Sequence, residues 1–202
     1  MRYLKLYSII LCITGSLSAN ALPVPEKPAP DFTGITTAGE TISLAGLRGK
    51  NVVLEWTNHE CPYVKKHYNT GNMQRTQSEL TKEGVVWISI ISSAEGLQGY
   101  VSAEKADELT ASRGSYTDYV VLDPTGKIGK MYNARTTPQM FLINKEGNLE
   151  YMGAIDDKPS ARATTIDGAR NHLLEAWKEI QSGKPVTMRS TKPYGCSVKY
   201  SD

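Results

Sequence analysis

Two strongly apolar stretches limit what this 202-residue chain can fold into. The first, at 51–56, contains a Val-Val-Leu run, and the second, at 85–91, is apolar almost throughout. Such runs are typical of strands that are covered on both faces. The segment between them, 62–82, has a helical pattern interrupted at 70–72, which predicts a kink or two helices. Because a helical crossover joins parallel strands, the sequence predicts an α/β protein.

The rest of the chain continues this alternation of strands and helices. The further predicted elements are a helix at 103–112, strands at 119–122, 139–143 and 149–152, a short helix at 127–132 and a last helix at about 165–181. A βαβ unit followed by a ββα unit predicts a central mixed sheet flanked by helices. Trp56, Trp87 and Trp177 are predicted to lie in its core.

The N-terminus has the pattern of a secretory signal peptide, predicted to span residues 1–21. Arg2 and Lys5 precede a short apolar run at 6–17, and a small-x-small cleavage site follows at 19–21. The run is too short to span a membrane, which takes roughly 20 apolar residues. We therefore expect export across the inner membrane, with the mature chain in the periplasm and without a membrane span.

Removal of residues 1–21 would take away two positive charges and no negative ones, so the formal charge of +2 would fall to zero. A neutral chain gives no indication of nucleic acid or an anionic membrane as a partner. The predicted divisions of the remainder are a proline-rich lead-in at 22–30, one domain at 31–185 and a C-terminal segment at 186–202.

Cys61 stands where the first predicted strand passes into the helix, and Pro62 follows it. Proline suits the first position of a helix, so Cys61 is expected at the helix N-terminus. The unpaired N–H groups and the helix dipole there favour a thiolate over a thiol. Cys61 is therefore the candidate nucleophile; the alternative is an inert buried cysteine.

Cys196 is the second cysteine that would remain after signal cleavage. In an oxidising compartment, two cysteines form either a structural disulfide or a redox pair, and we favour the redox pair. Cys196 would then resolve the reaction of Cys61 on a mobile segment. A static clamp over the site and a bond outside the chain are the alternatives.

Four motifs, in this order, resemble those of one protein family. They are the entry at 29–32 followed by 47–50, Cys61-Pro62 in the place of the first cysteine of a CxxC motif, the connector at 123–126, and Thr137-Pro138 before a strand. Together they resemble the peroxiredoxin-like branch of the thioredoxin superfamily (redoxin or thiol-specific antioxidant domains) in a secreted bacterial form.

This resemblance implies a thioredoxin-like fold with an N-terminal extension and an insertion after the second core strand. It implies a cis Pro138 that places Thr137 beside Cys61, where it would align an extended substrate. It also implies protein thiols, protein disulfides or a peroxide as substrate, an external thiol as reductant and no cofactor.

The sequence departs from the family pattern at both of its usual active-site motifs. Val64 stands where CxxC has its second cysteine. The peroxidatic P-x-x-x-T-x-x-C motif is also broken, because Leu54 and Asn58 occupy its proline and threonine positions and Thr57 is displaced by one. Arg135, three residues before Pro138, has no clear place as the peroxide-stabilising arginine. Disulfide exchange and peroxide reduction therefore both stay open.

Several charged side chains flank Cys61. His59 is a candidate for lowering the thiol pKa, and Glu55 for moving protons as a buried acid. Lys65, Lys66 and His67 are predicted to be solvated helix-face residues.

The sequence thus favours an exported thiol-dependent oxidoreductase with Cys61 as nucleophile. The second hypothesis is a non-catalytic binding module with a structural Cys61–Cys196 disulfide. A third, copper or zinc handling by His59, Cys61 and His67, has residue types that suit these metals, but their spacing matches no standard site.

Overall fold

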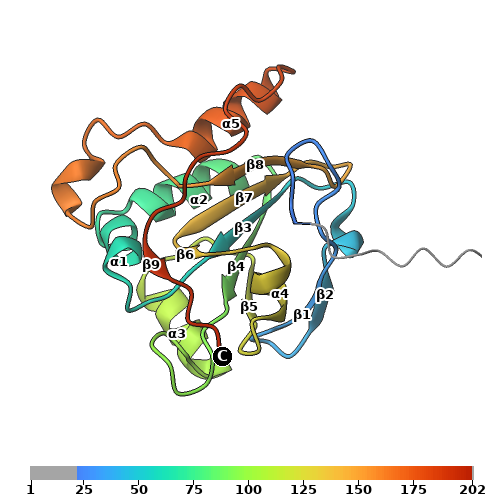
Figure 1. Ribbon diagram of the computed structural model, residues 1–202. Coiled ribbons are helices and arrows are strands. Elements are labelled where there is room, and N and C mark those ends of the chain that lie inside the picture. Colours follow the sequence, from blue (N-terminus) through green and yellow to red (C-terminus); the bar gives the residue numbers. More distant parts are fainter. Residues whose placement is uncertain (1–21, 202) are drawn as a thin grey trace, which may run out of the picture.

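The structure is a computed structural model that describes residues 22–201 (Figure 1). The predicted signal peptide, residues 1–21, lies outside the described residues. No helix of residues 22–201 is long and apolar enough to cross a membrane. The lead-in at 22–30 is not extended throughout, because a turn at 25–27 with Glu26 at φ +66° interrupts it. It pairs with the turn before β8 (Leu149–Gly153), where Pro28 forms a bridge to Asn148.

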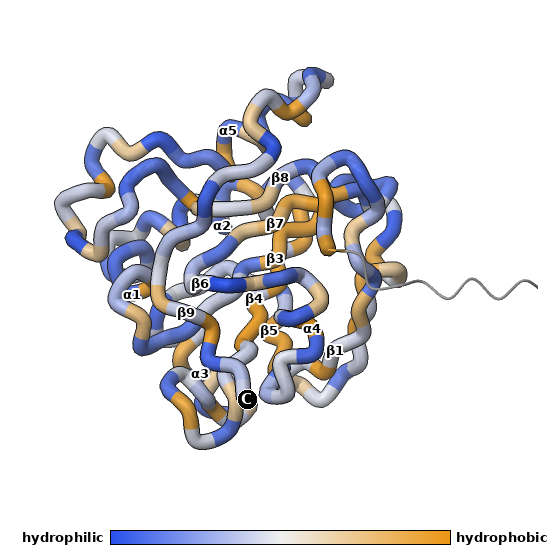
Figure 2. The backbone as a smooth tube through the Cα atoms, viewed as in Figure 1, coloured by the Kyte–Doolittle hydropathy of each residue, from blue (hydrophilic) through white to orange (hydrophobic). Residues whose placement is uncertain are grey.

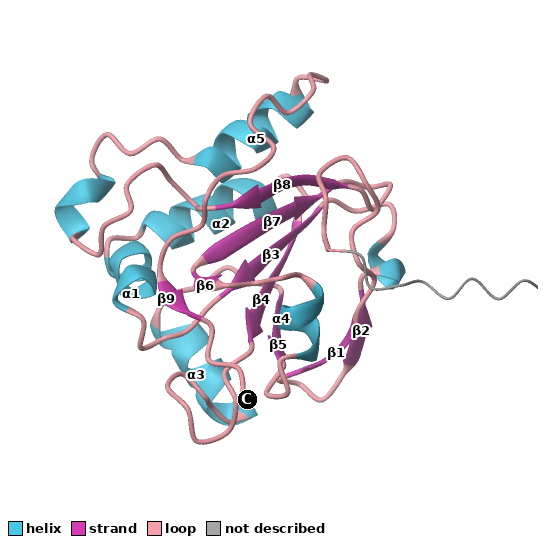
Figure 3. Ribbon diagram, in the orientation of Figure 1, coloured by secondary structure: helices cyan, strands magenta, loops and turns pink. Residues whose placement is uncertain are grey.

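The core is a seven-stranded mixed sheet in the order β2-β1-β5-β4-β3-β7-β8. Three central strands, β3, β4 and β5, run parallel, and the outer strands pair antiparallel. The bounds of the other strands of this sheet are β1 Thr33–Thr36, β2 Thr41–Ser43, β3 Val52–Trp56, β4 Val86–Ile91, β5 Tyr119–Leu122 and β7 Gln139–Ile143. The α/β prediction is confirmed, and Figure 3 shows the helices on both sides of the sheet.

The helices agree with the predicted pattern except at the last one. They are α1 Pro62–Asn69, α2 Asn72–Thr81, α3 Ala103–Ser112, α4 Lys127–Met131 and α5 His172–Gln181, with short 3₁₀ helices at Ala45–Leu47 and Ala163–Ile166. The predicted interruption between α1 and α2 is present, with Gly71 at φ +71°. The predicted start of the last helix at about 165 is wrong. Asn171 caps α5 by accepting from the Leu174 N–H, and Gly168 at φ +69° separates it from the preceding turn.

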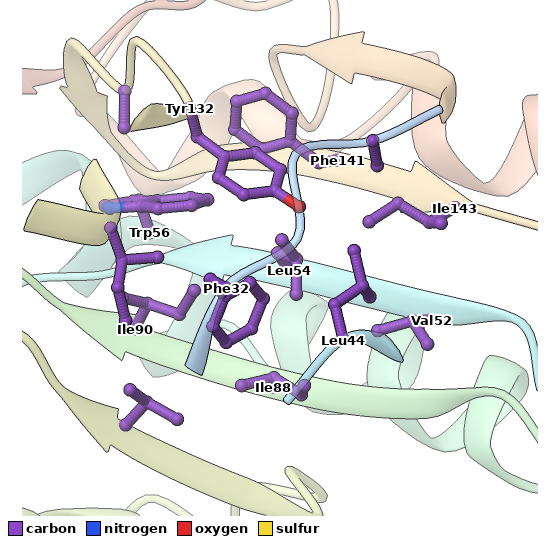
Figure 4. Packing of buried hydrophobic residues seen from close by; sticks show 14 of the residues in the cluster. Phe32, Leu44, Val52, Leu54, Trp56, Ile88, Ile90, Tyr132, Phe141 and Ile143 are labelled. Carbon is purple, nitrogen blue, oxygen red and sulfur yellow. The ribbon is translucent and has the colours of Figure 1, made fainter. Parts of the chain in front are cut away.

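Alternate residues of β3 supply two cores, one on each face of the sheet. Val52, Leu54 and Trp56 lie in the core to which α4 contributes Ile128, and the ring centroids of Trp56 and Phe141 are 5.1 Å apart there (Figure 4). Val53 lies in the other core, under α1, α2 and α5. Figure 2 shows apolar residues concentrated along the central strands. Burying one such large side chain contributes about 1.5–3 kcal/mol.

All three tryptophans lie in these cores, as predicted: Trp56 and Trp87 have no exposed surface and Trp177 is 4% exposed.

The C-terminal segment, residues 186–201 here, is packed against the domain. Ser190 forms a parallel bridge to Met152, and the Ala94 N–H donates to the Lys199 carbonyl. Between these points a two-residue strand, β9 (Cys196–Ser197), pairs antiparallel with β6 (Thr136–Thr137) in a separate sheet. Figure 1 shows this red segment running from α5 past β8 and β6 towards α3. Nothing in the sequence pattern indicates β6 or β9, because each is too short to have a period.

Candidate functional site

A tight turn after β3 presents Cys61 at the start of α1. The Cys61 N–H donates to the Asn58 carbonyl at 3.1 Å, and the Asn58 side chain accepts from the Glu60 N–H at 2.9 Å. Cys61 has extended backbone angles and is the N-cap of α1, with Pro62 at the first helical position. The local prediction for this stretch is therefore confirmed.

Two distant parts of the chain meet at the Cys61 sulfur. The Thr137–Pro138 peptide bond is cis, as the resemblance implies, and the Thr137 carbonyl lies 3.2 Å from Cys61 Sγ. Cys196 Sγ lies 2.7 Å from Cys61 Sγ, and the two cysteines are unbonded. A disulfide has a sulfur–sulfur distance of about 2.05 Å. The cysteines can therefore join without a large backbone movement.

The two thiols differ in acidity. Burial by itself raises the pKa of Cys61, but hydrogen bonds, chiefly from the Cys196 thiol and also from the Val64 N–H, outweigh it and lower that pKa below its ordinary value. For Cys196, burial together with the neighbouring Cys61 sulfur raises the pKa to about 11. Cys61 is therefore the member of the pair that loses its proton first, and Cys196 the member that keeps its proton longer.

The two cysteines also differ in their exposure to solvent. Cys61 has no exposed surface, whereas Cys196 is partly exposed and lies over it. Val64, at the second position of a CxxC motif, is 1% exposed and packs in the core with Cys61. Cys196 thus reaches Cys61 from β9, the strand that pairs with β6 before the cis proline.

Glu55 is fully buried in the core beneath α1 and α2. Its carboxylate accepts hydrogen bonds from Tyr68 at 3.0 Å and Trp87 at 2.9 Å, and more distant ones from Gln77 and Ser89 at 3.3 Å. Burial raises its pKa above the ordinary value, and the bonds from Trp87 and Tyr68 offset this in part. These bonds occupy the carboxylate and do not connect it to Cys61, so its role in proton transfer stays a prediction.

His59 lies near the turn but makes no hydrogen bond to either cysteine sulfur within residues 22–201. It lines a small cavity with Thr57, Tyr68 and Arg113. Burial lowers the pKa of His59, which keeps the ring neutral near pH 7. Its predicted influence on the Cys61 pKa stays a prediction.

The prediction that Lys65, Lys66 and His67 are all solvated is confirmed for Lys65 and wrong for the other two. Lys66 is 3% exposed and His67 has no exposed surface. Both lie against Asp156, which follows β8, and Tyr194, two residues before Cys196. The reason is tertiary: the loop after β8 and the C-terminal segment cover this face of α1. Sequence reasoning missed Asp156 and Tyr194, for which no local pattern gives a signal.

Metal binding gains no support from the geometry. Within residues 22–201, no group of three or more His, Cys, Asp or Glu side chains is arranged to hold a metal ion. Both ring nitrogens of His67 also have other partners, Tyr194 and Asn72.

Comparison with protein families matches residues 25–152, well over half of the chain, to the AhpC/TSA family. The chain belongs to this family. The match includes Cys61 and Pro138 and ends before Cys196. The redoxin resemblance of the sequence is therefore confirmed, and the second cysteine of this AhpC/TSA protein lies outside the part that matches.

One curated protein and two solved structures are similar to this chain. Sporulation thiol-disulfide oxidoreductase A of Bacillus subtilis (strain 168) is 28% identical over 148 residues, which are 73% of this chain and 84% of the relative. A hypothetical protein of Sinorhizobium meliloti 1021 has a TM-score of 0.73 at 20% identity and covers 88% of this chain and 95% of its own. A putative thiol:disulfide interchange protein DsbE from Chlorobium tepidum has a TM-score of 0.52 at 20% identity, over 64% of this chain and 84% of its own. These structures show that the AhpC/TSA protein has the thioredoxin-like fold.

Proposed function

We propose that this protein is a thiol–disulfide oxidoreductase in which Cys61 and Cys196 form the redox pair. The observation that carries the proposal is the 2.7 Å separation of the two sulfurs, together with their opposite pKa shifts. A cysteine of lowered pKa beside a cysteine of raised pKa is an arrangement in which the first attacks a disulfide and the second then resolves it. The name of the Bacillus subtilis relative agrees with this activity.

The reaction follows from these two sulfurs. The Cys61 thiolate attacks one sulfur of a substrate disulfide, and the other substrate sulfur leaves as a thiolate that takes up a proton. The Cys196 thiol loses its proton and attacks Cys61 Sγ in the mixed disulfide. The second substrate thiol is released and a Cys61–Cys196 disulfide remains. An external thiol reductant returns the pair to the dithiol, and in the opposite direction the same steps oxidise a substrate.

Disulfide exchange is better supported than peroxide reduction. Arg135 is exposed, and its side chain donates to Asn133 at 3.2 Å. The residue that replaces the motif threonine, Asn58, uses its side chain within the turn and towards the Gln98 carbonyl. The groups that would polarise a peroxide are therefore engaged elsewhere. We include export to the periplasm in the proposal, on the strength of the N-terminal sequence pattern.

The test is a redox titration of the mature protein in graded thiol–disulfide buffers, with mass spectrometry after alkylation of free thiols. We expect one two-electron Cys61–Cys196 couple that equilibrates at biologically relevant potentials, and no such couple in Cys61→Ser or Cys196→Ser. Reduction of a protein disulfide should depend on Cys61 in the same variants.

A Cys61–Cys196 disulfide whose reduction potential is below about −300 mV would instead indicate the structural disulfide of a binding module. Hydrogen peroxide consumption that requires Cys61 would favour the peroxidase-like alternative.

A further inference from the structure

The C-terminal segment is bound at the site as an extended chain. Cys196 is in register with Thr137, the residue before the cis proline, and Ser197 is in register with Thr136. The pairing continues beyond β9, since the Val198 N–H donates to the Arg135 carbonyl at 3.0 Å. Main-chain pairing of this kind is how proteins hold an added peptide strand.

This bound strand closes the site. Cys61 has no exposed surface while Cys196 lies over it. Thiol–disulfide exchange requires direct approach of the incoming sulfur to the thiolate. An outside chain that pairs with Thr137 must therefore take the place of β9.

Gly195 sets a steric condition on what can pair there. Its φ is +141°, and a Cβ at this position would overlap the Thr137 carbonyl oxygen and lie 2.7 Å from the carbonyl carbon. These are backbone atoms of the strand itself, so they cannot move aside as a flexible side chain would. A chain bound in this register and conformation needs glycine immediately before its cysteine.

A network of buried side-chain hydrogen bonds holds the segment at Tyr194, two residues before Cys196. The Tyr194 hydroxyl donates to the Asp156 carboxylate, and it lies 3.2 Å from His67 Nε2 and 3.3 Å from Lys66 Nζ. Asn72 donates to His67 Nδ1 at 2.8 Å, so the ring proton is on Nε2 and points to Tyr194. None of these contacts involves a cysteine, so the hold on the segment can be weakened separately from the redox pair.

We propose that the Thr136–Thr137 edge docks an extended segment of a partner protein that carries glycine immediately before its cysteine, and that residues 194–198 are a built-in occupant which this partner displaces. The inference rests on the proposed function, since it names the substrate class of the same site. We infer the chemistry of the partner segment from residues 194–198, which already occupy the site. Their glycine, their cysteine and their main-chain hydrogen bonds are the features that a partner segment must share.

The experiment uses a peptide copy of residues 191–200 and a second peptide with alanine in place of the glycine. Each peptide cysteine is activated as a mixed disulfide with thionitrobenzoate. When the Cys61 thiolate attacks the peptide sulfur, a Cys61–peptide disulfide forms and coloured thionitrobenzoate thiolate leaves. The protein carries Cys196→Ser so that the product accumulates, alone or with Tyr194→Phe. Tyr116→Phe, an exposed tyrosine away from the site, is the matched control.

We expect Tyr194→Phe to speed the reaction with the glycine peptide by about tenfold or more, because one bond to a charged group no longer holds the occupant. Tyr116→Phe should have no effect. The alanine peptide should react about tenfold more slowly than the glycine peptide with every variant, although both react equally with free cysteine.

Equal reaction rates for the glycine and alanine peptides overturn the inference. If the Cys196→Ser/Tyr194→Phe double variant does not fold, the two peptides can still be compared with the Cys196→Ser protein alone. A disulfide-linked dimer of the unsubstituted chain through Cys61 and Cys196 would also overturn it, because the occupant would be a second copy. Failure of Cys61 to react with any small aromatic disulfide, even in Tyr194→Phe, would refute the proposed function itself.

Discussion

Cys196 is in register with Thr137 across β6 and β9, and both residues contact the sulfur of Cys61. The strand that carries one cysteine is thus hydrogen-bonded to the cis-proline loop that covers the other. Redox chemistry and strand docking are therefore coupled at this site, although different side chains govern each of them.

The Cys61 pKa should depend on the donor at position 196. Because the Cys196 thiol is the main hydrogen-bond donor that lowers this pKa, Cys196→Ala should raise it. Cys196→Ser keeps an O–H donor and should raise it less. The thiolate absorbance of Cys61 followed against pH measures both, without requiring reagent access. Identical titration midpoints in the two variants would contradict the assigned hydrogen bond.

Gly195→Ala should weaken docking of the C-terminal segment and make the Cys61–Cys196 disulfide easier to reduce. An added methyl against a fixed backbone atom costs about 1–3 kcal/mol, which would appear as a less negative reduction potential. Gly39→Ala is the control, because Gly39 also has a positive φ (+78°) but a Cβ added there would meet no atom within 4 Å. It should lower stability and leave the redox potential unchanged. A shift of the same size in both variants would show that strain, and not the contact with Thr137, is responsible.

Glu55→Gln should change how stability depends on pH. Burial raises the Glu55 pKa above 4.5, so the native protein keeps this proton to a higher pH than the unfolded chain does. Its contribution to stability is full below pH 4.5 and is lost as the pH rises through the native pKa. The variant should therefore gain stability relative to the wild type as the pH rises. Unfolding in urea at several pH values measures this difference, and the exposed Glu95→Gln serves as control.

His67 should make stability depend on pH in the opposite direction to Glu55. Burial lowers the pKa of His67 to about 4, while Asp156 offsets this and Lys66 adds to it. The unfolded chain, with a value of 6.5, therefore binds the proton first as the pH falls. Stability is full above pH 6.5 and is lost towards pH 4, by up to about 3 kcal/mol.

His67→Gln should remove most of this loss when unfolding free energies at pH 7.5 and pH 4.5, roughly the two ends of that window, are compared. The partly buried His59→Gln should remove less. If the stability of His67→Gln falls as much at low pH as that of the wild type, other titrating groups cause the loss of stability.

The sequence by itself determined the elements around Cys61. Runs of apolar residues, the proline after the cysteine and the glycine between α1 and α2 act within a few residues, so β3, β4 and the helix start could be predicted directly. Thr137-Pro138 was also found, because the order of motifs resembles a known family. The last helix was placed too early, since Ile166 and Ala169 continue a helical spacing while Gly168 and the Asn171 cap end it.

Only the tertiary structure decided what meets Cys61. Cys196 is 135 residues away in sequence, and its position depends on two short strands that have no sequence period. The same packing buries Lys66 and His67, which an isolated α1 would expose to water. Such contacts depend on which backbone edges and faces come together when the whole chain folds, and local preferences do not specify them. The activated cysteine is thus a local property of the sequence, whereas its partner and its closed state are properties of the fold.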